Sequence, residues 1–356
     1  MGTIVEVHRD HEALREEWDR LADHVNGTPF HRPGWILAWC QSFATGQLRT
    51  LVVREDSRML ALLPMIEKHG ILRSPTNWHT PIFGPLTDGP ASASLIARAL
   101  IALRRRRVSL SFLDSQDLFL YAIQDGPAAT AGPIVHRAMQ HSPYIRTSGD
   151  RDLYFSGLPG DMRREIRRRR RRLETETGPV RLEILDGTTG LDRLLAQGFA
   201  LEASGWKAKR GTAIRSSVET LQFYESISRW AADRGMLRLA FLRAGEATIA
   251  FDLCLEHNSV HYLVKTGFDP GYRKFAPGTL MREQMINRAF DLDLTTYEFL
   301  GNNDSWKQQW TNDVRERLLI QIFAPSAPGL VDWAAYAYAR PLAKRVINAV
   351  RTRMPS

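Results

Sequence analysis

The fold is decided by the stretch Val264-Lys265-Thr266-Gly267-Phe268-Asp269-Pro270-Gly271-Tyr272-Arg273-Lys274-Phe275-Ala276-Pro277-Gly278-Thr279. This pattern predicts the end of a strand, a turn rich in glycine and proline, and the start of a helix. Free backbone amides at a helix N-terminus bind phosphate oxygens, and a proline in the first turn suits such a start. Arg273 and Lys274 add positive charge beside it. The pattern predicts a cradle for a pyrophosphate group, with an ordinary capped strand–turn–helix as the alternative.

The residues around this stretch predict a mixed α/β fold. Alternating and apolar runs predict strands at residues 180–185, 237–243, 247–256, 259–266, 296–300 and 317–323. Helical spacing predicts helices at 158–177, 190–205, 217–234 and 278–290. The first half has a similar order, with strands at 3–8, 49–54, 59–67 and 108–113 and helices at 12–25, 35–43 and 91–106. The common pattern of residues 50–113 and 237–300 predicts two tandem units, although no residue-level repeat is present.

Composition limits the class of protein. The chain has 356 residues, 44% of them hydrophobic, which suits about two globular domains. The net charge of +9 favours a polyanionic partner, and much of the excess lies in residues 104–107 and 163–172. The two cysteines, Cys40 and Cys254, lie in apolar settings and are expected to be reduced core residues rather than a disulfide or metal site.

The sequence contains no pattern typical of a secretory signal or a membrane span. The first residues lack a basic segment followed by an apolar one, and no apolar run reaches the ~18 residues that a bilayer requires. We therefore expect a cytoplasmic protein. The aromatic and basic segment 329–354 predicts a terminal helix, broken at Pro341, that packs on the body or lies on an anionic membrane surface.

Residues 158–177 predict a strongly basic helix. Eight arginines fall between Arg163 and Arg172, and Asp161 is placed to cap the helix start. Ile166 and Leu173 keep one apolar stripe. Three interpretations stay open for the arginines: a solvated face, a docking face for an anionic acceptor or carrier, and an RNA-binding face.

Carboxylates in two predicted strands are candidate general bases. An amine acceptor loses a proton during acyl transfer, so a base or a water relay is needed. Asp252 interrupts an apolar strand, where desolvation would raise its pKa, and Glu298 lies in a similar setting. Either residue could equally point to solvent. Asp304, in the loop that follows, is a third candidate.

Several motifs together resemble the CelD-like branch of the GNAT acyltransferases. They are Phe30 to Trp35, Ala61 to Pro64, Glu202 to Lys207, Tyr272 to Thr279 and Gly301 to Lys307. The order is similar, more remotely, to the Fem-type aminoacyl transferases, and the resemblance covers residues 1–325. It implies two tandem GNAT units in residues 1–155 and 156–325, the second catalytic, followed by a helical tail in 326–356.

The resemblance also implies roles for individual residues. The donor thioester would lie along Leu263, Val264 and Lys265, with its phosphates near Arg273, Lys274, Gly278 and Thr279. Backbone amides near residues 263–266 would polarise the carbonyl. Lys307 would stabilise developing charge, with Asp252 and Glu298 as further catalytic candidates. The acceptor would contact Trp206, Lys207, Tyr272, Asp304 and Trp306.

These roles predict an N-acyltransferase that uses acyl-CoA, with acetyl-CoA as the expected co-substrate, and no metal. The acceptor would be an amine on a small molecule, sugar, peptide or cell-envelope precursor. The loop lacks the usual glycine spacing of a GNAT phosphate loop, so an acyl carrier protein or aminoacyl-tRNA remains open as the donor. No nucleic acid other than tRNA is expected as a partner. A Fem-like transferase and a non-catalytic binding protein are the alternatives.

Overall fold

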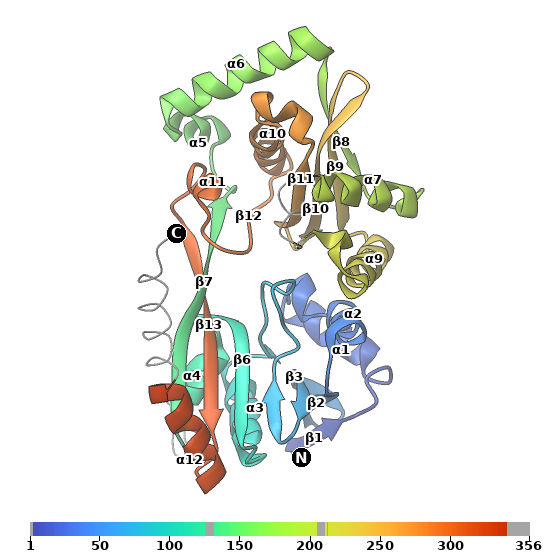
Figure 1. Ribbon diagram of the computed structural model, residues 1–356. Helices are drawn as coiled ribbons and strands as arrows, with labels where there is room; N and C mark the ends of the chain where they lie inside the picture. The colour runs from blue at the N-terminus through green and yellow to red at the C-terminus, as the bar shows by residue number, and fades with distance from the viewer. Residues whose placement is uncertain (1–2, 125–131, 205–210, 212, 340–356) are drawn as a thin grey trace, which may run out of the picture. The chain divides into compact units, whose positions relative to one another are not determined.

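The computed structural model describes residues 3–124, 132–204, 211 and 213–339. They form two compact units, each built from separate stretches of the chain (Figure 1). The first contains residues 1–36, 44–140 and 316–356, and the second contains 37–43 and 141–315. This division places residues 141–155 in the second unit and 316–325 in the first, whereas the sequence predicted boundaries after residues 155 and 325.

The first unit is a mixed sheet with helices. In spatial order its strands are β1 (Thr3–His8), β2 (Gln47–Glu55), β3 (Arg58–Lys68), β4 (Ile71–Arg73), β6 (Arg107–Asp114) and β13 (Val314–Phe323). The short β5 (Leu86–Thr87) pairs with β3. The helices are α1 (Arg15–His24), η1 (Pro29–His31), α3 (Pro90–Ala102), α4 (Leu118–Gln124) and α12 (Ala327–Ala334). Helix α2 (Pro33–Phe43) begins in the first unit and ends in the second. The predicted hairpin of residues 49–67 is confirmed, with β2 antiparallel to β3.

The second unit has a sheet in the order β7 (Ile134–Arg146), β12 (Thr296–Glu298), β11 (Val260–Phe268), β10 (Ala247–His257), β9 (Leu237–Ala244) and β8 (Val180–Leu185). β7 begins in the first unit and ends in the second. The helices are α5 (Arg151–Gly157), α6 (Gly160–Thr177), α7 (Leu191–Ala203), η3 (Ile214–Ser216), α9 (Val218–Asp233), η4 (Pro270–Phe275), α10 (Pro277–Asp291) and α11 (Ser305–Gln308). The predicted mixed α/β class is therefore confirmed.

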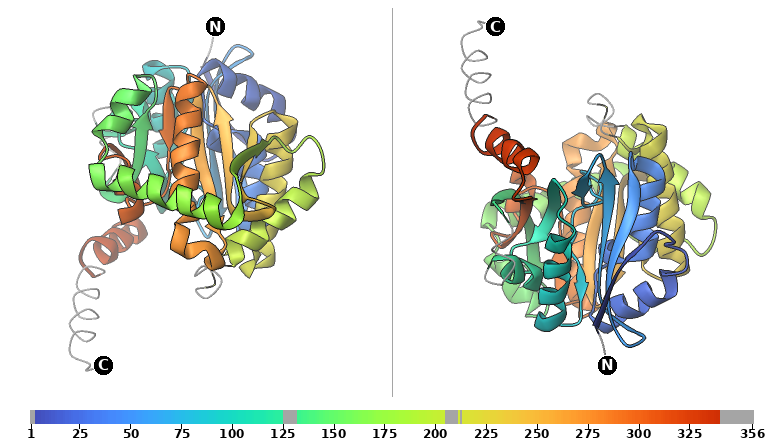
Figure 2. Two further views of the ribbon diagram at one scale, coloured as in Figure 1. Left: turned by 90° about the horizontal axis from the view of Figure 1, so that it is seen from above. Right: turned by 90° about the horizontal axis from the view of Figure 1, so that it is seen from below.

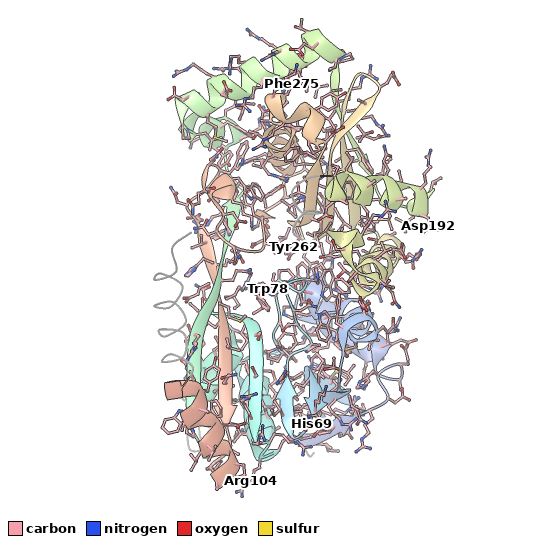
Figure 3. The ribbon with its side chains drawn as sticks, viewed as in Figure 1. His69, Trp78, Arg104, Asp192, Tyr262 and Phe275 are labelled. Atoms are coloured by element: carbon pink, nitrogen blue, oxygen red, sulfur yellow. The ribbon has the colours of Figure 1, made fainter. Side chains whose placement is uncertain are left out.

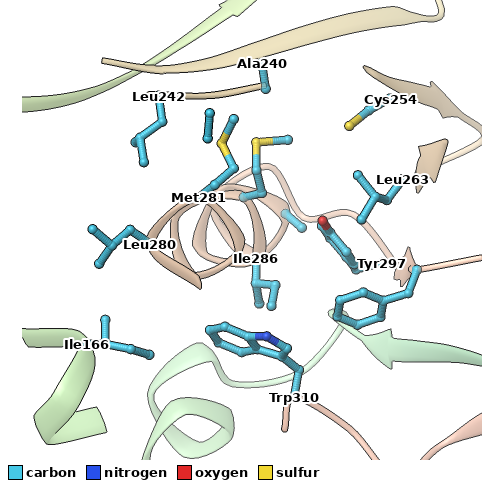
Figure 4. Packing of buried hydrophobic residues seen from close by; sticks show 14 of the residues in the cluster. Ile166, Ala240, Leu242, Cys254, Leu263, Leu280, Met281, Ile286, Tyr297 and Trp310 are labelled. Carbon is cyan, nitrogen blue, oxygen red and sulfur yellow. The ribbon is translucent and has the colours of Figure 1, made fainter. Parts of the chain in front are cut away.

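Helix α10 fills the core on one face of this sheet. Its Met281 and Ile286 are buried in one cluster with Leu263 and Tyr297 of the strands (Figure 4). Met285 belongs to the same cluster. Burial of apolar surface on this scale is the main favourable term in folding. Because α10 packs on the strands through its whole length, its N-terminus is held in a fixed place beside the end of β11.

The basic helix α6 lies across α10 (Figure 2, left). Ile166 and Leu173 are buried beneath it, as predicted. Five of its arginines form ion pairs with Asp161, Glu165, Glu176 or Glu283. The predicted Asp161 cap is wrong, because the N-cap residue is Pro159 and Asp161 lies within the first turn. Five of the eight arginines are therefore paired within the protein, by four carboxylates.

The described part of the C-terminal tail packs on the first unit. Tyr336 is buried, with the Arg137 guanidinium 4.5 Å from its ring centroid and the Phe323 ring 6.0 Å away. Helix α12 continues as a short π-helical turn, Ala335–Ala339. The remainder of the predicted helix, including Pro341, lies outside the described residues.

Gly267 allows β11 and α7 to approach closely. A Cβ atom at this position would lie 2.4 Å from Cα of Glu202, a backbone atom that cannot move aside. We expect Gly267→Ala to lower the free energy of unfolding by about 1–3 kcal/mol through overpacking. Thermal unfolding would measure this loss. Gly278→Ala is the control, because its Cβ would lie 3.7 Å from Phe268, an ordinary contact, and unchanged stability of Gly267→Ala would refute the argument.

Candidate functional site

The strands β11 and β12 part beside the core. They pair in parallel only from Val260↔Thr296 to Tyr262↔Glu298, where β12 ends, while β11 continues to Phe268. The register between β10 and β11 shifts here, since Leu253 pairs with Lys265 and Cys254 with Leu263. Val264 is the extra residue of this bulge. Bulges are common next to functional sites, where they change the direction of the backbone.

The stretch that follows β11 forms the expected helix start. Asp269 accepts a hydrogen bond from the Gly271 amide at 2.8 Å, and η4 leads to Ala276, the N-cap of α10. Ala276 has a left-handed φ of 51°, which is unfavourable for a residue with a Cβ. Thr279 N–H donates to the Ala276 carbonyl at 2.9 Å. The predicted strand–turn–helix is thus confirmed, and strain of this kind often marks functional sites.

A pocket of about 610 Å³ lies between the end of β11, the start of α10 and α11. This size falls in the range of sites for small molecules and cofactors, roughly 300–1,000 Å³. Five of the residues predicted from sequence line it: Arg273, Gly278, Thr279, Asp304 and Trp306. The structure therefore brings three of the four phosphate-cradle candidates and two acceptor candidates to one place.

Other predicted donor residues lie on the same elements but face elsewhere. The Lys265 ammonium lies 5.1 Å from the Tyr224 ring centroid, on the side of α9. Lys274 pairs with Glu176 of α6 at 2.6 Å. Tyr272, a predicted acceptor contact, packs near Phe275, which lies beneath α6 (Figure 3). Leu263 is buried in the core. Of the two predicted cations, Arg273 lines the pocket and Lys274 ties the cradle to α6.

The predicted catalytic carboxylates are both buried and paired. Asp252 is fully buried, and its Oδ2 lies 2.8 Å from Nη2 of Arg282. Glu298 accepts a hydrogen bond from Nε of Arg315 at 2.6 Å. Neither carboxylate lies among the residues that line the pocket. Their catalytic roles stay predictions, and the geometry gives each of them a cationic partner instead of a substrate.

Lys307 is also buried. Its ammonium donates to the carbonyls of Leu300 at 2.8 Å and Asn302 at 2.7 Å, and lies 3.2 Å from Asp304. Leu300 and Gly301 have left-handed φ angles of 53° and 62°, so the chain turns sharply at this point. Lys307 holds the turn that carries Asp304 and Trp306 to the pocket. Trp206 and Lys207 lie outside the described residues.

The sequence analysis assigned no role in the pocket to three charged residues that line it: Arg169, Glu202 and Arg282. Glu202 is buried and accepts a hydrogen bond from the Ile214 amide at 2.9 Å. Arg282 could have been found, because it falls on the apolar stripe of α10 with Met281, Met285 and Ile286. A charged residue on a buried helix face requires a partner or a ligand.

The described residues hold no activated thiol. Burial raises the pKa of the Cys40 thiol to about 12 and raises that of Cys254 strongly, so both are protonated at neutral pH. The same residues contain no group of three or more His, Cys, Asp or Glu side chains placed to hold a metal ion. In the described part of the chain, no helix combines the length and apolarity needed to cross a membrane.

Residues 160–308 match the family model of the acetyltransferase (GNAT) domain. The fold is similar to the crystal structure of FemX, with a TM-score of 0.60 and 11% identity over 90% of this chain and 97% of that one. It is also similar to the C-terminal domain of a putative lysylphosphatidylglycerol synthetase from Agrobacterium fabrum, with a TM-score of 0.57, 11% identity, and 90% and 96% coverage.

A third similar structure is a tandem GNAT protein from the clavulanic acid biosynthesis pathway, with a TM-score of 0.50 and 14% identity over 91% of this chain and 100% of that one. No curated protein sequence matches the chain. At these identities the solved structures support the fold, while the matching domain supports the type of chemistry. The predicted GNAT domain is confirmed for residues 160–308, and the predicted similarity to Fem-type proteins is confirmed for the fold.

Proposed function

We propose that the chain moves an acyl group, in the first instance acetyl, from a CoA thioester to an amine, because residues 160–308 match a GNAT-type acetyltransferase domain. The observation that carries the proposal is the pocket at the parting of β11 from β12, lined by the start of α10. The acceptor would be a sugar, a peptide or a cell-envelope precursor. The reaction would take place in the cytoplasm, with no metal.

The charges of the pocket suit a donor that carries phosphates. Arg273 of η4 and Arg169 of α6 line it beside the first turn of α10. Gly278 N–H belongs to that turn, where helix amides and the helix dipole favour an anion. The pyrophosphate would lie here, and the thioester would extend along the free edge of β11.

Acyl transfer in this site needs no covalent enzyme intermediate. Both cysteines are held as thiols by burial, which makes them poor nucleophiles. The acceptor amine would attack the thioester directly. Asp304 lines the pocket and its side chain is 52% exposed, so it is the carboxylate best placed to take the amine proton directly or through water.

Calorimetry with acetyl-CoA, free CoA and bulk tRNA at two salt concentrations tests the proposal. Saturable CoA binding that Gly278→Phe weakens more than tenfold would support it, because the new ring fills the space beside the first turn of α10. Gly157→Phe is the control, since an added Cβ at this exposed position at the end of α5 meets no atom within 4 Å. Absence of CoA binding by the wild type would overturn the proposal.

The basic helix α6 is the observation that favours one other donor, an aminoacyl-tRNA. Arg163, Arg167 and Arg171 are spaced one turn apart and form no ion pair within the described residues. Such a stripe suits a phosphate backbone, and binding would then fall steeply with salt. Salt-sensitive tRNA binding without CoA binding would select this alternative. An acidic acyl carrier protein would use the same arginine stripe.

The basic C-terminal segment, residues 329–354, is the candidate for peripheral contact with an anionic membrane.

A further inference from the structure

At the wall of the pocket, Arg282 forms a buried ion pair with Asp252 that folding alone does not explain. Arg282 and Asp252 are 1% and 0% exposed, and they lie among Ala250, Cys254 and Met281 of the apolar core. Removing two charges from water is costly, and apolar replacements of such pairs are often neutral or stabilising. A ligand that uses the pair would account for it, because Arg282 lines the pocket while Asp252 lies behind it.

The guanidinium of Arg282 is held in place by two partners, but one of its nitrogens has no hydrogen-bond acceptor. Nη2 faces Asp252 at 2.8 Å, and Nη1 donates to the hydroxyl of Tyr297. The Trp306 ring centroid lies 5.9 Å from its Cζ. Nε is buried and has no acceptor among the described residues. A buried donor without an acceptor is unfavourable, and because Arg282 lines the pocket, a ligand there can supply the acceptor.

Position and charge indicate which acceptor this is. Arg282 contacts Tyr297, the residue before the last one of β12. It also contacts Asp252 of β10, which pairs in register with the pocket residue Thr266 of β11. It therefore lies where the two strands part. Asp252 already balances the cation, so a neutral carbonyl oxygen fits better than a second carboxylate, which would leave net negative charge in a dry site.

We infer that Arg282 donates a hydrogen bond to the carbonyl oxygen of the donor thioester, and that Asp252 is its positioning residue. This inference rests on the proposed function. In the reaction the acceptor nitrogen forms a bond to the carbonyl carbon, and the π electrons move to the oxygen held by Arg282. The carbonyl then re-forms as the carbon–sulfur bond breaks, and the thiolate receives the proton that the amine loses. A fixed cation stabilises the charge that develops on the oxygen.

Two thioester analogues test the contact without knowledge of the acceptor. Acetyl-CoA carries the carbonyl, whereas S-ethyl-CoA has a methylene group in its place. We expect wild-type protein to bind acetyl-CoA about tenfold more tightly than S-ethyl-CoA, as suits a hydrogen bond from a charged group. Arg282→Met should bind the two equally, while its affinity for free CoA stays the same. Asp252→Asn should reduce the preference, because the guanidinium loses its anchor.

Control variants separate this contact from folding and from phosphate binding. The double variant Arg282→Met/Asp252→Leu leaves no unpaired buried charge, so it should fold and still show no preference. Arg169→Met should lower the affinity for acetyl-CoA, S-ethyl-CoA and free CoA by the same factor, and should keep the preference for acetyl-CoA over S-ethyl-CoA. CoA binding with an unchanged preference in the folded double variant would overturn the inference and leave the proposed function standing. Failure of the wild type to bind any of the three ligands would overturn the proposed function, and the inference with it.

Discussion

Lys307→Ala is expected to destabilise the second unit strongly. The ammonium donates to two backbone carbonyls in a buried position, and its removal leaves both without their charged donor. The expected loss is about 2–4 kcal/mol, because hydrogen bonds from charged groups contribute about 1.5–3 kcal/mol each. The turn at Leu300 and Gly301, with its left-handed φ angles, would then be free to relax. Thermal unfolding should show a melting temperature lower by about 5–10 °C.

Two further variants separate structure from chemistry at this position. Gln308→Ala removes the exposed neighbour that donates to the Asn303 carbonyl at 3.0 Å, and it should change stability little. Lys307→Met keeps the aliphatic stem, so it should lose stability through the missing hydrogen bonds alone. A Lys307→Ala protein with wild-type melting behaviour and no acyl transfer would show that the ammonium serves the substrate, as the family resemblance implied.

Local sequence patterns predicted the elements of the site well. The strand–turn–helix of residues 264–279 could be recognised because glycine, proline and apolar spacing are local signals. The boundaries differ slightly, since β11 runs on to Phe268 and α10 begins at Pro277. The left-handed Ala276 could not be foreseen, because alanine rarely adopts this conformation.

Side-chain partners could not be predicted in the same way. The alternation of β10 left open whether Asp252 faces the core or solvent. The answer depends on Arg282, 30 residues later, which reaches the strand only after α10 has packed on the sheet. Lys307 is a similar case, since a lysine in a polar loop gives no local sign of burial. The partners are set by tertiary packing, which a single sequence does not reveal.

The division of the chain into units also depends on distant pairing. The strand at residues 317–323 was expected to end the second unit, yet β13 pairs antiparallel with β6, from Arg317↔Asp114 to Phe323↔Arg107. Both partners belong to the first unit, together with the ion pair between Arg317 and Asp114. Periodicity predicts that a strand exists and leaves its neighbour undetermined.

Near this ion pair, the carboxyl of Asp117 makes stability depend on pH. Burial raises its pKa from 3.8 to about 6, and its Oδ2 would lie 2.7 Å from a Cβ at Gly84. A raised folded-state pKa means that folding favours the protonated form. The stabilisation is present below the unfolded pKa of 3.8 and is lost as pH rises through about 6. His31, which lies near Arg317 and Asp114, changes stability in the opposite direction with pH. Burial lowers its pKa from 6.5 to about 4, so the free energy of unfolding falls as the pH drops below 6.5.

Asp117→Asn should therefore stabilise the first unit at pH 8 by about 1–2 kcal/mol, less than the full shift implies because the residue is only partly buried. Asparagine still accepts the hydrogen bond that the Phe119 amide gives Asp117 at 2.9 Å. The gain should fall to a small fraction near pH 4, because Asp117 is then protonated in the folded state and about half protonated in the unfolded state, whose pKa is 3.8. Denaturant unfolding of the variant and the wild type at each pH isolates the effect from that of His31. Asp114→Asn is the matched control, since it leaves the buried Arg317 without its carboxylate and should destabilise at pH 8. If Asp117→Asn gave the same stability difference at pH 4 and pH 8, the change would reflect packing rather than the charge of the carboxylate.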